Sequence, residues 1–122
     1  MRARGFTLIE LLVVMAALGL LLSIATPRYF EHVERARETV LKHNLAALRQ
    51  AIDRFHGDRG RYPLELAELV RLQYLREVPL DPMTERTDSW VIAPPAGQST
   101  GVFDIRSPAA GHARDGSVYA AW

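Results

Sequence analysis

The side chains best suited to acid–base or metal chemistry in this chain are its four histidines, because the sequence contains no cysteine. His32 and His43 are eleven residues apart on one expected helix, which separates them by about 16 Å along its axis. A metal with ligands at about 2 Å cannot join them. The sequence also has no glycine-rich phosphate loop and no Gly-x-Ser-x-Gly turn. We therefore expect a protein that is not an enzyme.

The carboxylate in the most unusual position is Glu10, because the twenty-one residues 6–26 contain no other charged side chain. As a helix this stretch is about 31 Å long, close to the ~30 Å hydrocarbon thickness of a bilayer. An isolated acid inside a membrane-spanning segment costs about 3 kcal/mol on insertion. Glu10 therefore either has a partner there or extends its side chain to the membrane interface.

Residues 1–5 carry Arg2 and Arg4, which favour retention of this end in the cytoplasm and export of the rest. Two general interpretations of the N-terminus follow from this composition. It is an ordinary single-pass anchor, or it is a secretory signal with Ser23-Ile24-Ala25 as its cleavage site. The second interpretation predicts a small secreted binding domain.

A third interpretation follows from the run Gly5-Phe6-Thr7-Leu8-Ile9-Glu10-Leu11-Leu12-Val13-Val14. This run resembles the processing signature of type IV prepilins and type II secretion pseudopilins. The resemblance implies that a prepilin peptidase removes the leader 1–5 by cleaving between Gly5 and Phe6, and methylates the new amino group of Phe6. It also implies a helical filament, in which Glu10 aligns an incoming subunit with the Phe6 amine of its neighbour. Two such charges about 4 Å apart attract by roughly 4 kcal/mol at an effective dielectric near 20, before desolvation, which can offset the insertion cost.

The segments beyond residue 26 predict the fold. Apolar residues recur at helical spacing, so we expect one long helix over 6–56, with Arg49 and Asp53 paired on its wetter side. Its apolar stripe is expected to form a core: Leu41, Leu45, Leu48, Ile52 and Phe55. Further expected elements are a short helix over 64–70 and strands over 90–93, 102–105 and 118–122. The expected class is α+β: a long N-terminal helix, half transmembrane and half amphipathic, packed on a small C-terminal antiparallel sheet, with a pilin-like domain over 27–122.

Gly19 and Pro27 qualify the long helix. Pro27 has no amide hydrogen for the carbonyl of Ser23, and Gly19 costs about 1 kcal/mol relative to alanine. Related filament subunits carry a glycine and a proline at corresponding places. The resemblance therefore implies that this part loosens on assembly, and a plain kink is the alternative.

The rest of the chain resembles the major, G-type pseudopilins, notably in Arg59-Gly60-Arg61-Tyr62-Pro63 and in residues 74–82. Many pilins of surface fibres close a C-terminal loop with a disulfide, which this chain cannot form without cysteine. Major pseudopilins also bind calcium in a C-terminal loop, and the candidate ligands here are Asp104, Ser107 and Asp115. Calcium takes six to eight oxygens, whereas residues 107–116 contain one carboxylate, and Asp115-Gly116 is also typical of a turn.

These features predict a structural subunit of a type II secretion pseudopilus, a periplasmic filament that drives export of folded proteins across the outer membrane. The subunit is expected in the inner membrane, with its N-terminus in the cytoplasm and its C-terminal domain in the periplasm. The resemblance implies as partners further copies of the chain, minor pseudopilins, the prepilin peptidase, the inner-membrane assembly platform and membrane lipid. Fifteen basic and fourteen acidic residues leave a net charge of +1, which argues against a nucleic-acid partner. A pilin of a type IV or DNA-uptake pilus is the alternative.

Overall fold

The computed structural model describes residues 5–122, so Arg2 and Arg4 of the predicted leader lie outside the described residues. The chain divides into two compact units, Met1–Arg35 (unit 1) and Ala36–Trp122 (unit 2). Helix α1, Leu8–Arg59, contributes residues to both, and all later elements belong to unit 2. The predicted boundary after residue 26 marks the end of the apolar run, whereas the boundary after Arg35 separates the two compact units. The two boundaries therefore describe different properties of the chain.

Helix α1 begins at Leu8 because a capping box closes its first turn. The Thr7 hydroxyl oxygen accepts a hydrogen bond from the Glu10 amide at 3.1 Å, and the Glu10 carboxylate accepts one from the Thr7 amide at 3.3 Å. These bonds satisfy two amides that the start of a helix leaves without backbone partners. The helix therefore starts after the predicted Phe6, and it ends at Arg59 rather than His56.

Helix α1 continues through Pro27 without a break. In the turn before the proline, the Ser23 hydroxyl donates to the Leu20 carbonyl at 2.7 Å, and the Thr26 hydroxyl donates to the Leu22 carbonyl at 2.7 Å. Hydroxyls that bond to the preceding turn slightly destabilise and bend a helix. Together with the hydrogen bond that Pro27 cannot donate, they weaken α1 between residues 20 and 27.

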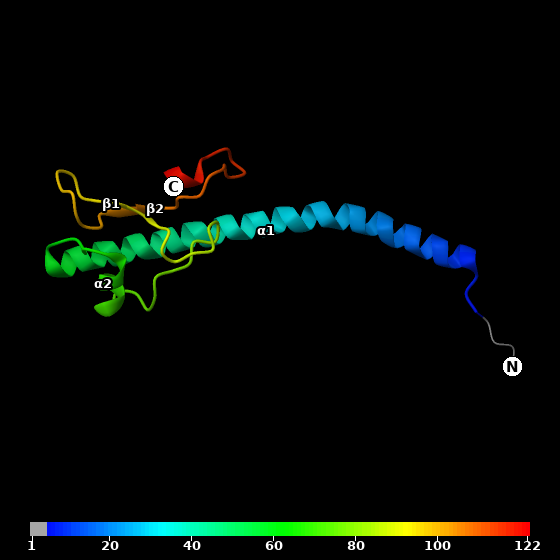
Figure 1. The fold of residues 1–122 in the computed structure, drawn as a ribbon, viewed down its shortest axis with the longest axis horizontal. Helices are drawn as coiled ribbons and strands as arrows, with labels where there is room; N and C mark the ends of the chain where they lie inside the picture. Colours follow the sequence, from blue (N-terminus) through cyan, green and yellow to red (C-terminus); the bar gives the residue numbers. More distant parts are fainter. Residues whose placement is uncertain (1–4) are drawn as a thin grey trace. The chain divides into compact units, whose positions relative to one another are not determined.

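The core of unit 2 is built on the apolar face of α1. All five residues of the predicted stripe are buried, with exposed fractions of 0 to 2%. Figure 1 shows helix α2, Leu66–Arg71, on one side of this part of α1 and strands β1, Val91–Ala93, and β2, Asp104–Arg106, on the other. Leu69 of α2 and Ile105 of β2 join the same core cluster. The predicted core face and the α+β class are confirmed.

The sheet has two antiparallel strands, with Ile92 opposite Ile105. The predicted third strand over 118–122 is wrong, because Tyr119–Ala121 form the 3₁₀ helix η1. Here the amide of Trp122 bonds to the carbonyl of Tyr119, three residues back, at 3.2 Å. The two rings of this pair meet edge to face, with centroids 5.2 Å apart, which folds the segment onto itself instead of extending it along β2.

The predicted pair of Arg49 with Asp53 is also wrong. Arg49 forms its ion pair with Asp104, at 2.8 Å, and Asp53 is exposed. A pair between exposed residues four apart on a helix contributes only about 0.3 to 0.5 kcal/mol. A partner brought in by the sheet therefore displaces the local one easily.

Candidate functional site

The predicted assembly residue, Glu10, lies in the first turn of α1 and is exposed. Phe6 precedes the helix and is 89% exposed. The hydrogen bond from Thr7 uses one acceptor position of a carboxylate that has about four. A cation on a neighbouring chain therefore has access to Glu10 while the capping box stays intact.

Sequence reasoning missed the role of Thr7. Its hydroxyl caps α1, and its amide holds the carboxylate of Glu10 beside the start of the helix. The signal was present in the sequence, because threonine followed three residues later by glutamate is the pattern of a capping box.

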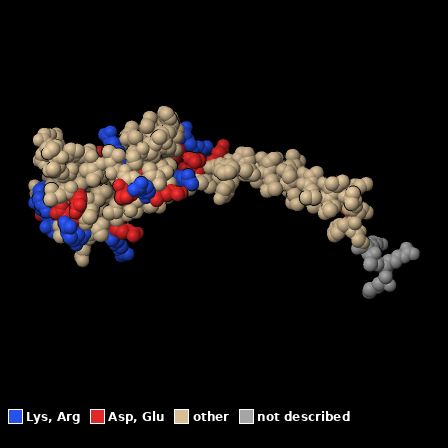
Figure 2. Space-filling view, in the orientation of Figure 1, with Lys and Arg blue, Asp and Glu red and all other residues tan. Residues whose placement is uncertain are grey.

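The first part of α1 is long and apolar enough to cross a membrane, and its large apolar side chains from Leu8 to Phe30 are exposed. The most apolar stretch has a mean hydropathy of 2.6, and none of it is buried. Figure 2 shows charged side chains over unit 2, whereas the visible face of α1 toward its N-terminal end carries none. A helix that is hydrophobic on all sides needs lipid or other protein around it, so this segment anchors the chain in a membrane.

The predicted flexibility residues lie on this same helix. A Cβ atom built onto Gly19 would meet no atom within 4 Å, so no packing contact among the described residues requires glycine there. Pro27 lies inside the helix, after the hydroxyl bonds of Ser23 and Thr26. Loosening of this segment on assembly stays a prediction.

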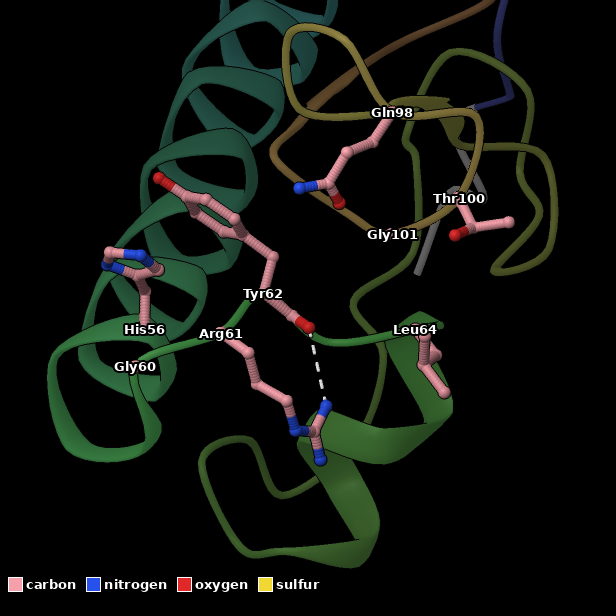
Figure 3. Close-up of a pocket in the computed structure, with 8 residues that line it drawn as sticks. All are labelled: His56, Gly60, Arg61, Tyr62, Leu64, Gln98, Thr100 and Gly101. Carbon is pink, nitrogen blue, oxygen red and sulfur yellow. Dashed lines mark hydrogen bonds between the residues drawn. The ribbon is translucent and has the colours of Figure 1, made fainter.

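A cavity of about 360 Å³ lies in unit 2 at the end of α1, between His56, Tyr62 and the loop that carries Thr100 (Figure 3). The His56 and Tyr62 rings stack, with centroids 4.2 Å apart. The rest of the lining includes the polar residues Gln98 and Thr100 of the loop.

Arg61 borders this cavity but is bound elsewhere. Figure 3 shows its guanidinium and the Tyr62 ring extending in opposite directions from the backbone. The guanidinium forms an ion pair with the buried Glu68 at 2.5 Å. Arg61, and after it the amide of Leu64, hold the pKa of Glu68 below its usual range. The pair thus joins the end of α1 to α2 and has a structural use.

Known proteins resemble the chain both at its N-terminus and beyond it. Residues 1–26 match the family described as the prokaryotic N-terminal methylation motif. Over 107 residues, 88% of this chain, the sequence is 29% identical to the type II secretion system core protein G of Dickeya chrysanthemi, of which it covers 70%. Residues 1–26 thus carry an N-terminal methylation motif, and most of the chain is similar to a type II secretion system core protein G.

Two shorter matches have higher identity. The chain is 40% identical over 62 residues to the type II secretion system core protein G of Klebsiella pneumoniae, and 43% identical over 61 residues to the type IV major pilin protein PilA of Myxococcus xanthus. These matches cover 51% and 50% of the chain but only 44% and 28% of the relatives. No solved structure matches the chain. Pseudopilins and pilins are structural subunits rather than enzymes.

The three candidate calcium ligands of this chain each have a different partner. Asp104 pairs with Arg49, and the hydroxyl of Ser107 donates to the buried Asp81 at 2.5 Å. Asp115 accepts the hydroxyl and the amide of Ser117, which hold its pKa below its usual range. Within residues 5–122 no three His, Asp or Glu side chains are grouped to hold a metal. The residues present do not fit a calcium ion.

Proposed function

We propose that this chain is a structural subunit of a type II secretion pseudopilus, a periplasmic helical filament that drives export of folded proteins across the outer membrane. The observation that carries the proposal is the extent of the likeness to a core protein G, which covers 88% of this chain. Because the likeness runs far beyond the methylation motif at 1–26, it includes unit 2. A shared N-terminal signal alone would leave pilins and pseudopilins equally favoured.

The proposed maturation step is cleavage between Gly5 and Phe6 by a prepilin peptidase, followed by methylation of the Phe6 amine. Residues 5–7 are exposed and precede the helix, which supports access of a peptidase to this bond. Gly5 has open space around it, in keeping with close approach of an enzyme to the backbone. The leader 1–5 would be lost and α1 retained.

The proposed assembly step pairs Glu10 of one copy with the Phe6 amine of the next. The carboxylate is exposed and keeps acceptor positions beyond its bond to Thr7. In the low dielectric of a membrane an unpaired carboxylate is costly, so a cation supplied by the neighbour favours one register of the helices over others. Glu10 thereby sets the position of each new subunit along the filament relative to its neighbour.

In this proposal residues 6–26 span the inner membrane, the N-terminus faces the cytoplasm and residues 27–122 lie in the periplasm. The bonds of Ser23 and Thr26 to the preceding turn support loosening of α1 between Gly19 and Pro27 as the subunit leaves the membrane. Minor pseudopilins, the inner-membrane assembly platform and membrane lipid are the further partners. No nucleic acid is required.

The variant Glu10→Gln tests the assembly step. The variant should insert into the membrane in the wild-type amount, measured by carbonate extraction. Its yield of filament in a sheared-fibre fraction should be at least about tenfold lower, which corresponds to a loss of about 1.4 kcal/mol in the free energy of assembly. Glu34→Gln is the matched control, since Glu34 is exposed on α1 outside residues 6–26. Normal assembly of Glu10→Gln would refute the pairing.

Intact mass and N-terminal sequencing of the same preparations test maturation separately. A methylated Phe6 supports the proposal, and a chain that begins at Thr26 indicates a cleaved secretory signal. A chain that retains residues 1–5 contradicts the maturation step.

The second candidate function is that of a type IV pilus or DNA-uptake pilin, which the 43% identity to the Myxococcus xanthus pilin over 61 residues favours. Electron microscopy of cells at normal expression separates the two. Free surface fibres containing this chain indicate a pilus, and their absence together with a secretion defect in a deletion strain indicates a pseudopilus.

A further inference from the structure

Three acceptor oxygens from the end of the chain converge on one side chain of α1. Arg49 donates from Nε to the Asp104 carboxylate at 2.8 Å, and from Nη2 to the carbonyl of Ile105 at 3.0 Å and to the main-chain oxygen of Trp122 at 2.6 Å. The acceptors lie 55, 56 and 73 residues from Arg49 in sequence. A single guanidinium thus ties both ends of the segment 104–122 to the helix.

The acceptors are of the kind that a hard divalent cation collects. Calcium is bound by carboxylates and backbone oxygens, and here one side-chain carboxylate oxygen and two main-chain oxygens share a positive group of the protein itself. A guanidinium stays protonated at any pH at which the protein is folded and donates in a fixed fork geometry. The Arg49 and Asp104 side chains are 36% and 31% exposed, so water screens them only in part.

A second helix cation reaches the same segment. Lys42 lies seven residues before Arg49, two helical turns away on the same side of α1. Its Nζ lies 4.5 Å from the centroid of the Trp122 ring, and the indole nitrogen of Trp122 donates to the hydroxyl of Ser117 at 2.7 Å. Ser117 in turn bonds to Asp115. The turn that was expected to supply a calcium ligand is therefore connected to Lys42 through Trp122.

We propose that Arg49 and Lys42 act as built-in cations that hold the segment 104–122 against α1, so that unit 2 folds and stays folded without calcium. The carboxylate of Asp104 is neutralised by Arg49, Ser107 is used by Asp81, and Asp115 is used by Ser117. No group of three His, Asp or Glu side chains is placed to hold a metal among the described residues. The inference concerns the folding of unit 2 and holds whether or not the chain forms a filament.

The test is thermal unfolding of the full chain in detergent micelles, followed by tryptophan fluorescence. The two tryptophans, Trp90 and Trp122, both lie in unit 2, so the signal reports that unit and not the membrane helix. The midpoint of thermal unfolding of the wild type should differ by less than about 1 °C between about 5 mM calcium chloride and about 5 mM EDTA. This calcium concentration is above the dissociation constants of weak extracellular calcium sites, so a site of that kind would be filled. A rise of more than about 3 °C in calcium would overturn the proposal.

The variant Arg49→Gln should lower the midpoint by about 8 °C in both solutions, because it removes three hydrogen bonds from a partly shielded cation. The control is Arg54→Gln, since Arg54 is exposed on the same helix and forms no ion pair among the described residues; its midpoint should not change. Equal midpoints for Arg49→Gln and Arg54→Gln would also overturn the proposal.

A third variant, Arg49→Lys, covers the case in which Arg49→Gln does not fold. Lysine keeps the positive charge but lacks the forked guanidinium, so the unfolding midpoint of Arg49→Lys should lie between those of the wild type and Arg49→Gln. If Arg49→Gln does not fold, the midpoint of Arg49→Lys should lie well below that of the wild type. A wild-type midpoint for Arg49→Lys would show that the three-way geometry is not needed. The comparison of wild-type protein in calcium and EDTA needs no variant and decides the calcium question by itself.

Discussion

The buried pair formed by Asp81 and Ser107 makes a specific prediction about the stability of unit 2. Asp81 is 0% exposed and Ser107 1% exposed. The Ser107 hydroxyl donates to Asp81 Oδ2 at 2.5 Å, and Oδ1 accepts the amide of Met83 at 2.8 Å. Ser107→Ala leaves Oδ2 without its donor in a place that water does not reach. It also removes the acceptor of the Ala109 amide, which bonds to the same hydroxyl at 3.2 Å.

The size of the effect follows from these two losses. A hydrogen bond to a charged group contributes about 1.5 to 3 kcal/mol, and a buried amide without an acceptor costs about 1 kcal/mol or more. We expect Ser107→Ala to lower the free energy of unfolding of unit 2 by about 3 kcal/mol. For a domain of roughly 60 to 100 residues this corresponds to a fall of roughly 15 °C in Tm.

The measurement is a urea titration of the full chain in detergent micelles, followed by the fluorescence of Trp90 and Trp122. Ser99→Ala is the matched control, because Ser99 is an exposed loop residue, and its free energy of unfolding should change by less than about 0.5 kcal/mol. The double variant of Ser107→Ala with Asp81→Ala should be less destabilised than the two single variants added together, since each single variant removes the same bond. A loss below about 1 kcal/mol for Ser107→Ala would refute the reasoning.

Three further predictions concern α1 and α2. The pKa of Glu68 is lowered in the folded protein by Arg61 and by the Leu64 amide. At pH values above the unfolded pKa of about 4.3, the Glu68 carboxylate therefore stabilises unit 2 in full. This contribution is lost as the pH falls through the lower folded pKa. Between about pH 6 and 3 the unfolding free energy, measured by urea titration, should thus fall more steeply in the wild type than in Glu68→Gln. Leu48→Ala removes a side chain that is 0% exposed, and the same titration should show a loss of about 3 kcal/mol. Thr7→Val removes the acceptor of the Glu10 amide, so hydrogen exchange by NMR should show roughly fivefold faster exchange of that amide, a loss of about 1 kcal/mol.

Each of these predictions has its own control. Glu65→Gln changes an exposed carboxylate next to α2, so its unfolding free energy should fall with pH as steeply as that of the wild type. If the unfolding free energy of Glu68→Gln also fell as steeply as that of the wild type, the role of Glu68 would be contradicted. Gln50→Ala changes an exposed position on α1 and should have little effect, so a similar small loss for Leu48→Ala would argue against the core. Thr7→Ser keeps the hydroxyl and should retain slow exchange at Glu10; unchanged exchange in Thr7→Val would argue against the cap.

The sequence by itself determined the long helix, its core face and the membrane anchor. These features follow from the spacing of apolar residues, which is a local property of the chain and does not depend on what packs against it. The stripe from Leu41 to Phe55 is buried as its period predicts, and the apolar run 6–26 is exposed. The processing signature around Gly5 and Glu10 is equally local, and residues 1–26 match the methylation motif.

Only the tertiary structure decided the partners of the polar side chains. Arg49 bonds to Asp104, Ile105 and Trp122 instead of Asp53, and the expected calcium ligands are distributed among separate contacts. Within the segment predicted as a third strand, Tyr119–Ala121 form a 3₁₀ helix, and the rings of Tyr119 and Trp122 pack edge to face. The physical reason is that a pair between exposed side chains four residues apart contributes a few tenths of a kcal/mol, whereas one guanidinium with three acceptors in partial shelter from water contributes more. Such a contact forms between residues more than fifty positions apart, and no local pattern encodes their approach.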